Sequence, residues 1–152
     1  MLGLNDKGFF CQVSSDIYPV ELVLSRTDDN GTQADYLDMD ISANADGFFH
    51  SKLFDKRDGF SFKVINFPCI SYSNIPSSPA YGIFISQILR LCRICNYYSD
   101  FDIAVMKLTH QFLDKGFDKT LLCKKFEKFV SNYEREWAKF GCLPELPTCL
   151  TR

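Results

Sequence analysis

The chain has 152 residues, of which 46% are hydrophobic and 24% charged, the ordinary balance of a globular protein able to bury a core. Its 15% aromatic content, including fifteen Phe, argues against disorder, and no apolar run approaches the ~18 residues that a transmembrane helix needs. The formal net charge of −2 is far from the basic excess that would by itself indicate nucleic-acid binding.

The charge is unevenly distributed along the chain. Residues 1–78 carry 6 Lys or Arg and 11 Asp or Glu, a net charge of −5. Residues 79–135 carry 9 and 6, a net charge of +3. A basic region of this kind is what a local contact with a polyanion requires.

The N-terminus, MLGLNDKGFF, has an early acid and no long apolar segment, so we do not expect a secretory signal peptide. The seven cysteines are therefore expected to be reduced thiols, and their odd number agrees because disulfide pairing would leave one unpaired. These features predict an intracellular protein, cytoplasmic or nuclear, with no membrane association.

The first half of the sequence alternates apolar and polar residues with the period of β-strands. The pattern predicts four strands, over residues 21–27, 36–42, 48–54 and 60–65. Turn sequences separate them, at residues 28–31, 45–47 and 56–59. Short connections of this kind favour an antiparallel β-meander.

A loop rich in Ser, Pro and Asn at 66–78 divides the chain, and the sequence beyond it has the period of α-helices. The pattern predicts three helices, over residues 79–96, 100–115 and 118–136. Ser78 before Pro79 is a candidate cap for the first helix. Ser99 with Asp102 resembles a capping box at the start of the second, which Gly116 is expected to end.

Each predicted helix has one apolar face that should point inward. The expected inward residues are Tyr81, Phe84, Ile85, Ile88, Leu91, Cys92 and Cys95, then Phe101, Val105, Leu108 and Phe112, then Leu122, Phe126, Phe129, Val130 and Tyr133. The predicted fold class is therefore α+β, an antiparallel β-meander followed by a three-helix module. The alternative is a tighter unit in which the helices cover one face of the sheet. Residues 141–152, with Pro144 and Pro147, are expected to be extended or disordered.

The stretch YLDMDIS at 36–42 places Asp38 and Asp40 two residues apart on a predicted strand, so both side chains would point to the same face. Two such carboxylates could hold Mg²⁺, as in a metal-dependent nuclease, with Lys52 on the next strand nearby. We favour a half-buried strand with an acidic outer face, because a third acid is missing and His50 stands where it would be expected. No catalytic or metal-binding residue is therefore assigned.

Cys92 and Cys95 form a C-x-x-C motif, which can indicate zinc binding or redox chemistry. The motif lies on the apolar face of a predicted helix, and no second Cys pair or spaced His pair accompanies it. We therefore favour core packing. His50 and His110 are isolated and receive no ligand role, and no cofactor is predicted.

Basic residues form the candidate binding site. Arg90 and Arg93 share a face of the first predicted helix, and Lys124 and Lys128 lie one turn apart on the third. The full candidate set is Lys56, Arg57, Arg90, Arg93, Lys119, Lys124, Lys125 and Lys128. These residues form either an ordinary solvated surface or a surface that follows a phosphate backbone.

Two stretches of the chain match a known family, one running from DKRDGF at 55–60 to NFP at 66–68 and the other, SNIPSSPAYGIFISQILR, at 73–90. Shorter matches lie at residues 17–19, 21–22, 36–38, 98–101, 115–117 and 126–129. Together they resemble the region downstream of the catalytic motif in reverse transcriptases of animal retroelements, most of all the Penelope-like group. The resemblance covers about residues 17–133 and is specific over 73–90.

The resemblance implies the end of a palm subdomain followed by a thumb-like, helix-turn-helix-like module that grips the primer-template in a whole enzyme. In these terms the chain divides into a palm-edge-like β-meander, a linker loop, the thumb-like module and a tail, at residues 1–66, 67–78, 79–136 and 137–152. The catalytic Asp-Asp hairpin of such elements lies N-terminal to this region. YLDMDIS then resembles the strand that follows the active site, and no polymerase activity is expected.

The expected function is weak, sequence-independent nucleic-acid binding by a reverse-transcriptase fragment that lacks the catalytic motif. The missing parts of such an enzyme are the other expected partner. The alternative is a non-catalytic protein-interaction module derived from a transposable element. Such a module would expose apolar surface formerly buried against absent subdomains, which predicts self-association or a protein partner.

Overall fold

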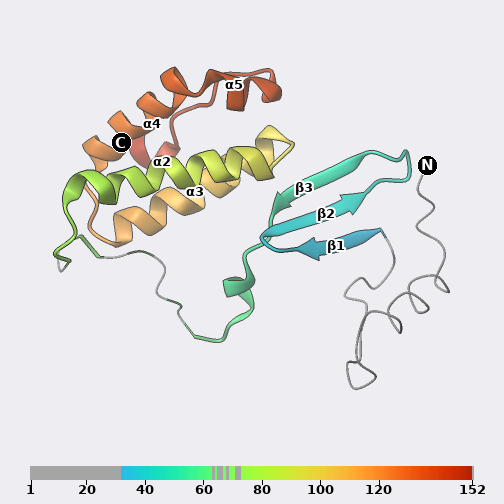
Figure 1. Cartoon of the computed structure of the whole chain (residues 1–152), viewed down its shortest axis with the longest axis horizontal. Helices are drawn as coiled ribbons and strands as arrows, with labels where there is room; N and C mark the ends of the chain where they lie inside the picture. The colour runs from blue at the N-terminus through green and yellow to red at the C-terminus, as the bar shows by residue number, and fades with distance from the viewer. Residues whose placement is uncertain (1–31, 63, 65–66, 68, 71–72, 152) are drawn as a thin grey trace, which may run out of the picture.

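The computed structural model describes residues 32–62, 64, 67, 69–70 and 73–151. A three-stranded antiparallel sheet is followed by a layer of helices (Figure 1), which confirms the predicted α+β class. The predicted strand at 21–27 and the turn at 28–31 lie outside the described residues.

The sheet has the strand order β1-β2-β3, formed by Gln33–Tyr36, Met39–Ala43 and Phe49–Leu53. Tyr36 pairs with Met39, so Leu37 and Asp38 form a two-residue hairpin turn. The prediction of one continuous strand over 36–42 is therefore wrong. The segment QADY of β1 alternates polar and apolar residues over only four positions, all of them exposed, so its pairing with β2 rather than its own pattern makes it a strand.

The predicted strand at 48–54 is confirmed as β3, and Gly47 turns the chain before it with φ 80°. The predicted strand at 60–65 is absent from its described residues, 60–62 and 64. The preceding turn is a 3-10 helix, η1, at Lys56–Gly59. Asp55 caps η1 by accepting a hydrogen bond from the backbone N–H of Arg57 at 3.1 Å, which turns the chain away from the sheet.

The three predicted helices are confirmed, with ends shifted by a few residues, as α2 at Ser77–Ile94, α3 at Tyr98–Asp114 and α4 at Lys119–Asn132. The third helix was predicted to continue to residue 136, but Tyr133 interrupts it with φ −123° and ψ 36°. Three short elements follow: α5 at Glu134–Trp137, η3 at Ala138–Phe140 and α6 at Thr148–Thr151.

The structure confirms one predicted helix end and contradicts two predicted N-terminal caps. Gly116, with φ 81°, follows the end of α3 as predicted. The caps predicted at Ser78 and at Ser99 with Asp102 are wrong, because α2 begins at Ser77 and α3 at Tyr98, without a side-chain cap. A side chain caps a helix from the residue just before it, and both serines lie inside their helices.

The core lies between α2, α3 and α4. Its largest fully buried side chains include Phe84 of α2, Phe112 of α3 and Phe129 of α4. The rings of Phe84 and Phe112 meet at 5.2 Å between centroids. The predicted inward faces are therefore confirmed, although Ile85, Val130 and Tyr133 are only half-buried.

The expectation of an extended or disordered tail at 141–152 is only partly confirmed, because residues 143–147 lie in neither helix nor strand but residues 148–151 form α6. Pro147 is fully buried and Leu150 is 4% exposed, and α6 packs against α3 and α4. The short apolar run around Pro147 and Leu150 therefore adds to the core beside α3 and α4, which prolines alone do not reveal.

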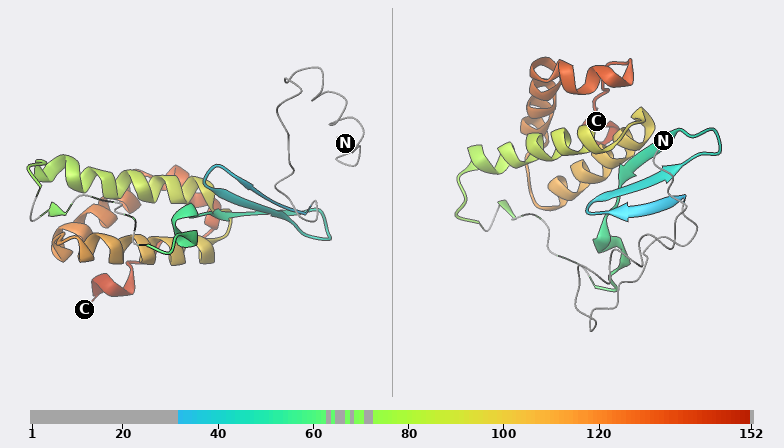
Figure 2. Two further views of the ribbon diagram at one scale, coloured as in Figure 1. Left: turned by 90° about the horizontal axis from the view of Figure 1, so that it is seen from below. Right: turned by 45° about the vertical axis from the view of Figure 1, so that its right-hand side comes forward.

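The sheet extends from one end of the helices, as Figure 2 shows. The helices contact it mainly along β3 and do not cover one of its faces. Met39 of β2 and Leu53 of β3 pack against the helical core, and polar contacts complete the attachment. Asn96, in the loop between α2 and α3, donates from its backbone N–H to the Ser51 carbonyl at 3.1 Å and from Nδ2 to the Phe49 carbonyl at 2.7 Å. His50 Nε2 lies 2.7 Å from Oδ2 of Asp100 on α3. The tighter alternative fold, with helices over one sheet face, is thus not observed.

Candidate functional site

The two carboxylates of YLDMDIS do not form a pair. Asp40 lies on β2 and is 7% exposed, with Lys52 Nζ at 3.2 Å and Gln33 Nε2 at 3.0 Å. Asp38 lies in the β1–β2 turn and pairs with Arg90 of α2. Each carboxylate therefore forms an ion pair with a different basic side chain. Among the described residues, no three His, Cys, Asp or Glu side chains are arranged to hold a metal ion.

The three arginines of the candidate set each bind a carboxylate of the chain. Arg57 makes a bidentate contact with Asp55, with N···O distances of 2.6 and 2.8 Å. Arg93 makes a second one with Glu136 of α5, at 2.7 and 3.1 Å. Hydrogen bonds from Arg57 lower the pKa of Asp55 to about 2, so this carboxylate stays ionised. These guanidinium groups are therefore partly neutralised before any ligand binds.

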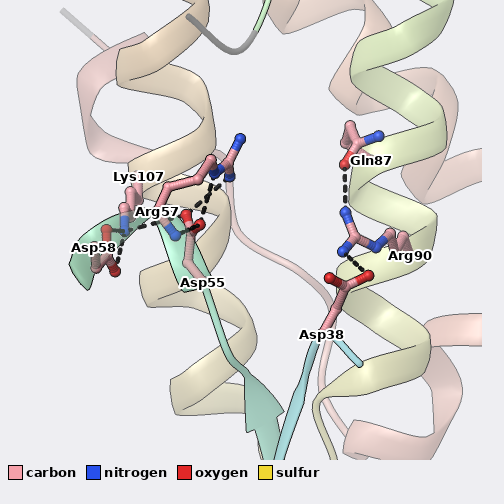
Figure 3. Close-up of polar contacts among 7 residues, drawn as sticks. All are labelled: Asp38, Asp55, Arg57, Asp58, Gln87, Arg90 and Lys107. Carbon is pink, nitrogen blue, oxygen red and sulfur yellow. Dashed lines mark hydrogen bonds and ion pairs between the residues drawn. The ribbon is translucent and has the colours of Figure 1, made fainter. Parts of the chain in front are cut away.

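The side chains of Arg90 and Arg93 do not form one continuous basic surface. Arg90 reaches the β1–β2 turn and also donates to Gln87 Oε1 at 3.2 Å, as Figure 3 shows. Arg93 points toward α5 instead. Their sequence spacing correctly placed them on one helix, but their ion pairs direct them to different parts of the molecule.

The lysines of α4 point in two directions around the helix axis. Lys124 and Lys128 are exposed and lie about 40° apart around the axis, with half-buried Lys125 on their flank. Lys119 is about 140° from Lys124 and lies near Cys149 of α6, where its charge partly opposes the rise in pKa that burial of the Cys149 thiol causes. In the described part of the chain, none of these lysines forms an ion pair. We call Lys124, Lys125 and Lys128 the α4 lysine face.

A pocket of about 510 Å³ lies between the β1–β2 turn, residues 53–57, α2 and α3. Its charged lining residues are the four cations Lys56, Arg57, Arg90 and Lys107 and the two carboxylates Asp38 and Asp55, an excess of two positive charges. The sequence reasoning had found Lys56, Arg57 and Arg90 but not Lys107. Lys107 Nζ contacts Asp58 at 2.7 Å and Asp55 at 3.6 Å, residues too distant in sequence for any spacing to indicate.

Cys92 and Cys95 are fully buried free thiols in the core, which confirms the packing interpretation of the C-x-x-C motif. Burial raises the pKa of the Cys92 thiol to about 11, so it remains protonated and unreactive. Of the two histidines, His50 binds Asp100 and His110 is exposed, with Nδ1 2.9 Å from the Met106 carbonyl oxygen.

Comparisons with known protein families, with curated proteins and with solved structures find no match to this chain. Within the described ranges, none of the helices has both the length and the apolar character needed to cross a membrane.

Proposed function

We propose that the helical half binds the phosphate backbone of nucleic acid, weakly and without sequence preference, through the α4 lysine face. The observation that supports this proposal is that some basic side chains form ion pairs with carboxylates of the chain and others do not. Lys124, Lys125 and Lys128 form no ion pair with other described residues, whereas Arg57, Arg90 and Arg93 each bind a carboxylate. Unpaired ammonium groups on one helix face release counterions when they meet phosphates.

The expected affinity is modest. With about three phosphate contacts, log affinity should fall against log salt with a slope near −3 on duplex, and binding should be micromolar or weaker. The acidic residues 1–78, with a net charge of −5, oppose binding through long-range repulsion. On the described face of α4, Asn132 is the one amide in line with Lys124 and Lys128, and a single amide does not read a base sequence, so sequence preference is not expected.

The test is a salt titration by fluorescence anisotropy on two labelled duplexes of different sequence. Replacing Lys124, Lys125 and Lys128 by Ala should bring the slope close to zero on both duplexes. The matched control replaces Lys52, Arg93 and Lys107 by Gln, which removes the same charge from cations that already have carboxylate partners. It should retain most of the slope. Equal losses in both variants would mean that net charge alone acts, and absence of binding at low salt would reject the proposal.

The resemblance to reverse transcriptases supports a gripping role without catalysis. We propose that the chain has no polymerase activity. Asp38 pairs with Arg90 and Asp40 with Lys52, so the two carboxylates do not form a pair that could bind two Mg²⁺ ions. Template-dependent nucleotide incorporation that an Asp38→Asn/Asp40→Asn variant loses would overturn this. We also propose an intracellular location, cytoplasmic or nuclear, which the six free cysteines of the described residues support.

The second candidate function is protein interaction, including self-association. It is favoured by six large apolar side chains in the sheet half that are 53–68% exposed: Tyr36, Leu37, Phe48, Phe49, Phe60 and Phe62. Light scattering after size-exclusion chromatography should then show a dimer or larger species that a Phe48→Ser/Phe49→Ser variant loses. A strictly monomeric chain that binds no hydrophobic dye would exclude this candidate.

A further inference from the structure

The pocket between the sheet and the helices is separate from the α4 lysine face. The β1–β2 turn and residues 53–57 close it on the sheet side, and α2 and α3 form its helical walls. Leu91, Ala104 and Leu108 supply an apolar surface, and each is less than 10% exposed. A volume of about 510 Å³ is in the range of pockets that bind small organic molecules.

The charged groups of the pocket differ in how firmly they are held. Asp55 has only 9% of its side chain exposed and binds Arg57 through both the backbone and the guanidinium group, so this pair is a fixed part of the wall. Asp38 and Arg90 are 56% and 41% exposed, and their contact is a single ion pair in reach of water. Exposed ion pairs contribute little to stability, so an incoming anion could replace Asp38 at low cost.

Asp38 marks the position that an external anion would take. Figure 3 shows its carboxylate directed at Arg90, with Arg57 and Lys107 on the other side of the same space. The Asp38 charge also raises the pKa of Arg57 as a minor contribution after that of Asp55, so it lies within electrostatic reach of the second guanidinium. The described contacts of Arg57 and Arg90 leave part of each guanidinium available for further hydrogen bonds.

We propose that this pocket binds an organic phosphate monoester, with the phosphate between Arg57 and Arg90 and the apolar body against Leu91, Ala104 and Leu108. Asp58 neutralises Lys107 from outside the lining, so once Asp38 is displaced the four cations face two carboxylates, Asp55 and Asp58. The two remaining positive charges match a dianionic phosphate, whereas a carboxylate would leave one unmatched. Gln87 holds Arg90 from the side of α2, so the guanidinium keeps its orientation after Asp38 leaves.

The experiment is calorimetric titration of the full chain at about pH 8, where a phosphate monoester is dianionic. The probes are 1-naphthyl phosphate, whose aromatic body is apolar, and adenosine monophosphate, whose aromatic body also carries polar groups. Inorganic phosphate and 1-naphthol are the comparison ligands that have only one of the two recognised groups. At least one ester should bind about tenfold or more tightly than both comparison ligands, because charge and apolar contact act together.

Three variants separate the pocket from other sites. Arg90→Gln should weaken binding of the ester about tenfold, since it removes a charge-assisted hydrogen bond. The matched control, Arg93→Gln, lies on the same helix but outside the pocket and should change nothing. Asp38→Asn should strengthen binding several-fold by removing the competing carboxylate, a gain that a merely structural role of Asp38 would not produce.

The α4 lysine variant should bind the ester like the unmodified chain, so the pocket and the nucleic-acid proposal fail or succeed independently. Absence of ester binding at millimolar concentration would overturn the proposal. So would an unchanged affinity in Arg90→Gln, or inorganic phosphate that binds as tightly as both esters.

Discussion

The helical half and the sheet half are stabilised by different interactions. The helices enclose an apolar core in which Phe84, Phe112 and Phe129 are fully buried. The sheet contributes one buried residue among its described strands, Asp40, and exposes Phe48 and Phe49 at the turn between β2 and β3. It is attached to the helices by the half-buried Met39 and Leu53, by hydrogen bonds around Asn96 and by ion pairs such as Asp38 with Arg90.

This difference shows how one short chain can combine a stable unit with an adaptable one. Apolar burial scales with area and is not screened by ions as charge pairs are, so the helices should keep their packing as ionic strength changes. Exposed ion pairs and hydrogen bonds contribute less and can exchange with water or with a ligand. The proposed phosphate pocket lies where these two kinds of structure meet.

The largest expected effect compares the two halves directly. Phe129→Ala should lower the free energy of unfolding by about 3–5 kcal/mol, because it removes a fully buried ring and leaves a cavity. Phe49→Ala, at a site 65% exposed, should change it by less than about 0.5 kcal/mol. Urea denaturation followed by circular dichroism measures both. Similar losses would show that the sheet is packed as tightly as the helices.

A smaller effect is expected at the junction, where Asp55 binds Arg57 beside Lys107 of α3. The pKa of Asp55 is lowered from 3.8 to about 2 in the folded chain, with the hydrogen bond from Arg57 as the largest cause. The ionised form is thus favoured by folding, so its contribution is present above about pH 4 and is lost as pH falls through 2. Its size is about 1–2 kcal/mol, because water screens part of the interaction.

Asp55→Asn should therefore destabilise the chain by about that amount at pH 7 and flatten the acid dependence of stability between pH 4 and 2. Urea midpoints measured across this pH window report the change. Asp46→Asn, in the exposed β2–β3 turn, is the control and should leave the profile as it is. An Asp55 variant with the original acid profile would refute the assignment.

The attachment of β3 is expected to depend on Asn96. Asn96→Ala removes the acceptor of the Ser51 N–H and the donor to the Phe49 carbonyl, which should cost about 1–2 kcal/mol. Hydrogen exchange should accelerate in β3 and stay unchanged in the core of α2 and α3. Asn132→Ala, at the exposed end of α4, is the control. Equal acceleration in both regions would mean that sheet and helices open as one unit.

The smallest expected effects lie in the two sheet turns. Leu37 has φ 56°, which an L-residue with a side chain adopts at a cost, so Leu37→Gly should relieve strain and stabilise the hairpin by up to about 1 kcal/mol. Gly47→Ala, at φ 80° with no neighbouring atom within 4 Å, should destabilise by a similar amount through backbone strain alone. Denaturation midpoints that move in the same direction for both variants would contradict this.

The helical half was largely predictable because helix signals are local. The apolar spacing from Tyr81 to Cys92 located α2, and Gly116 located the end of α3. The C-x-x-C motif could be assigned to the core from its place on that face alone. The sheet was less predictable, since the hairpin at residues 33–43 depends on which segment pairs with β2 rather than on its own pattern.

The candidate site was only partly predictable. The sequence identified Arg57, Arg90 and Arg93 as cations on plausible faces, but their carboxylate partners come from other elements and became visible only in the folded chain. The same holds for Lys107 in the pocket. Side chains far apart in sequence meet only after the helices pack, so no spacing rule indicates them.

By itself, the sequence determined the α+β class, the three helices and their inward faces, because periodicity and glycine conformations act within a few residues. Tertiary structure alone decided that Asp38 faces Arg90, that Pro147 and Leu150 close the core, and that a cationic pocket opens between sheet and helices. The physical reason is that burial and ion pairing depend on surfaces brought together by folding, and a single chain offers each charged side chain many partners.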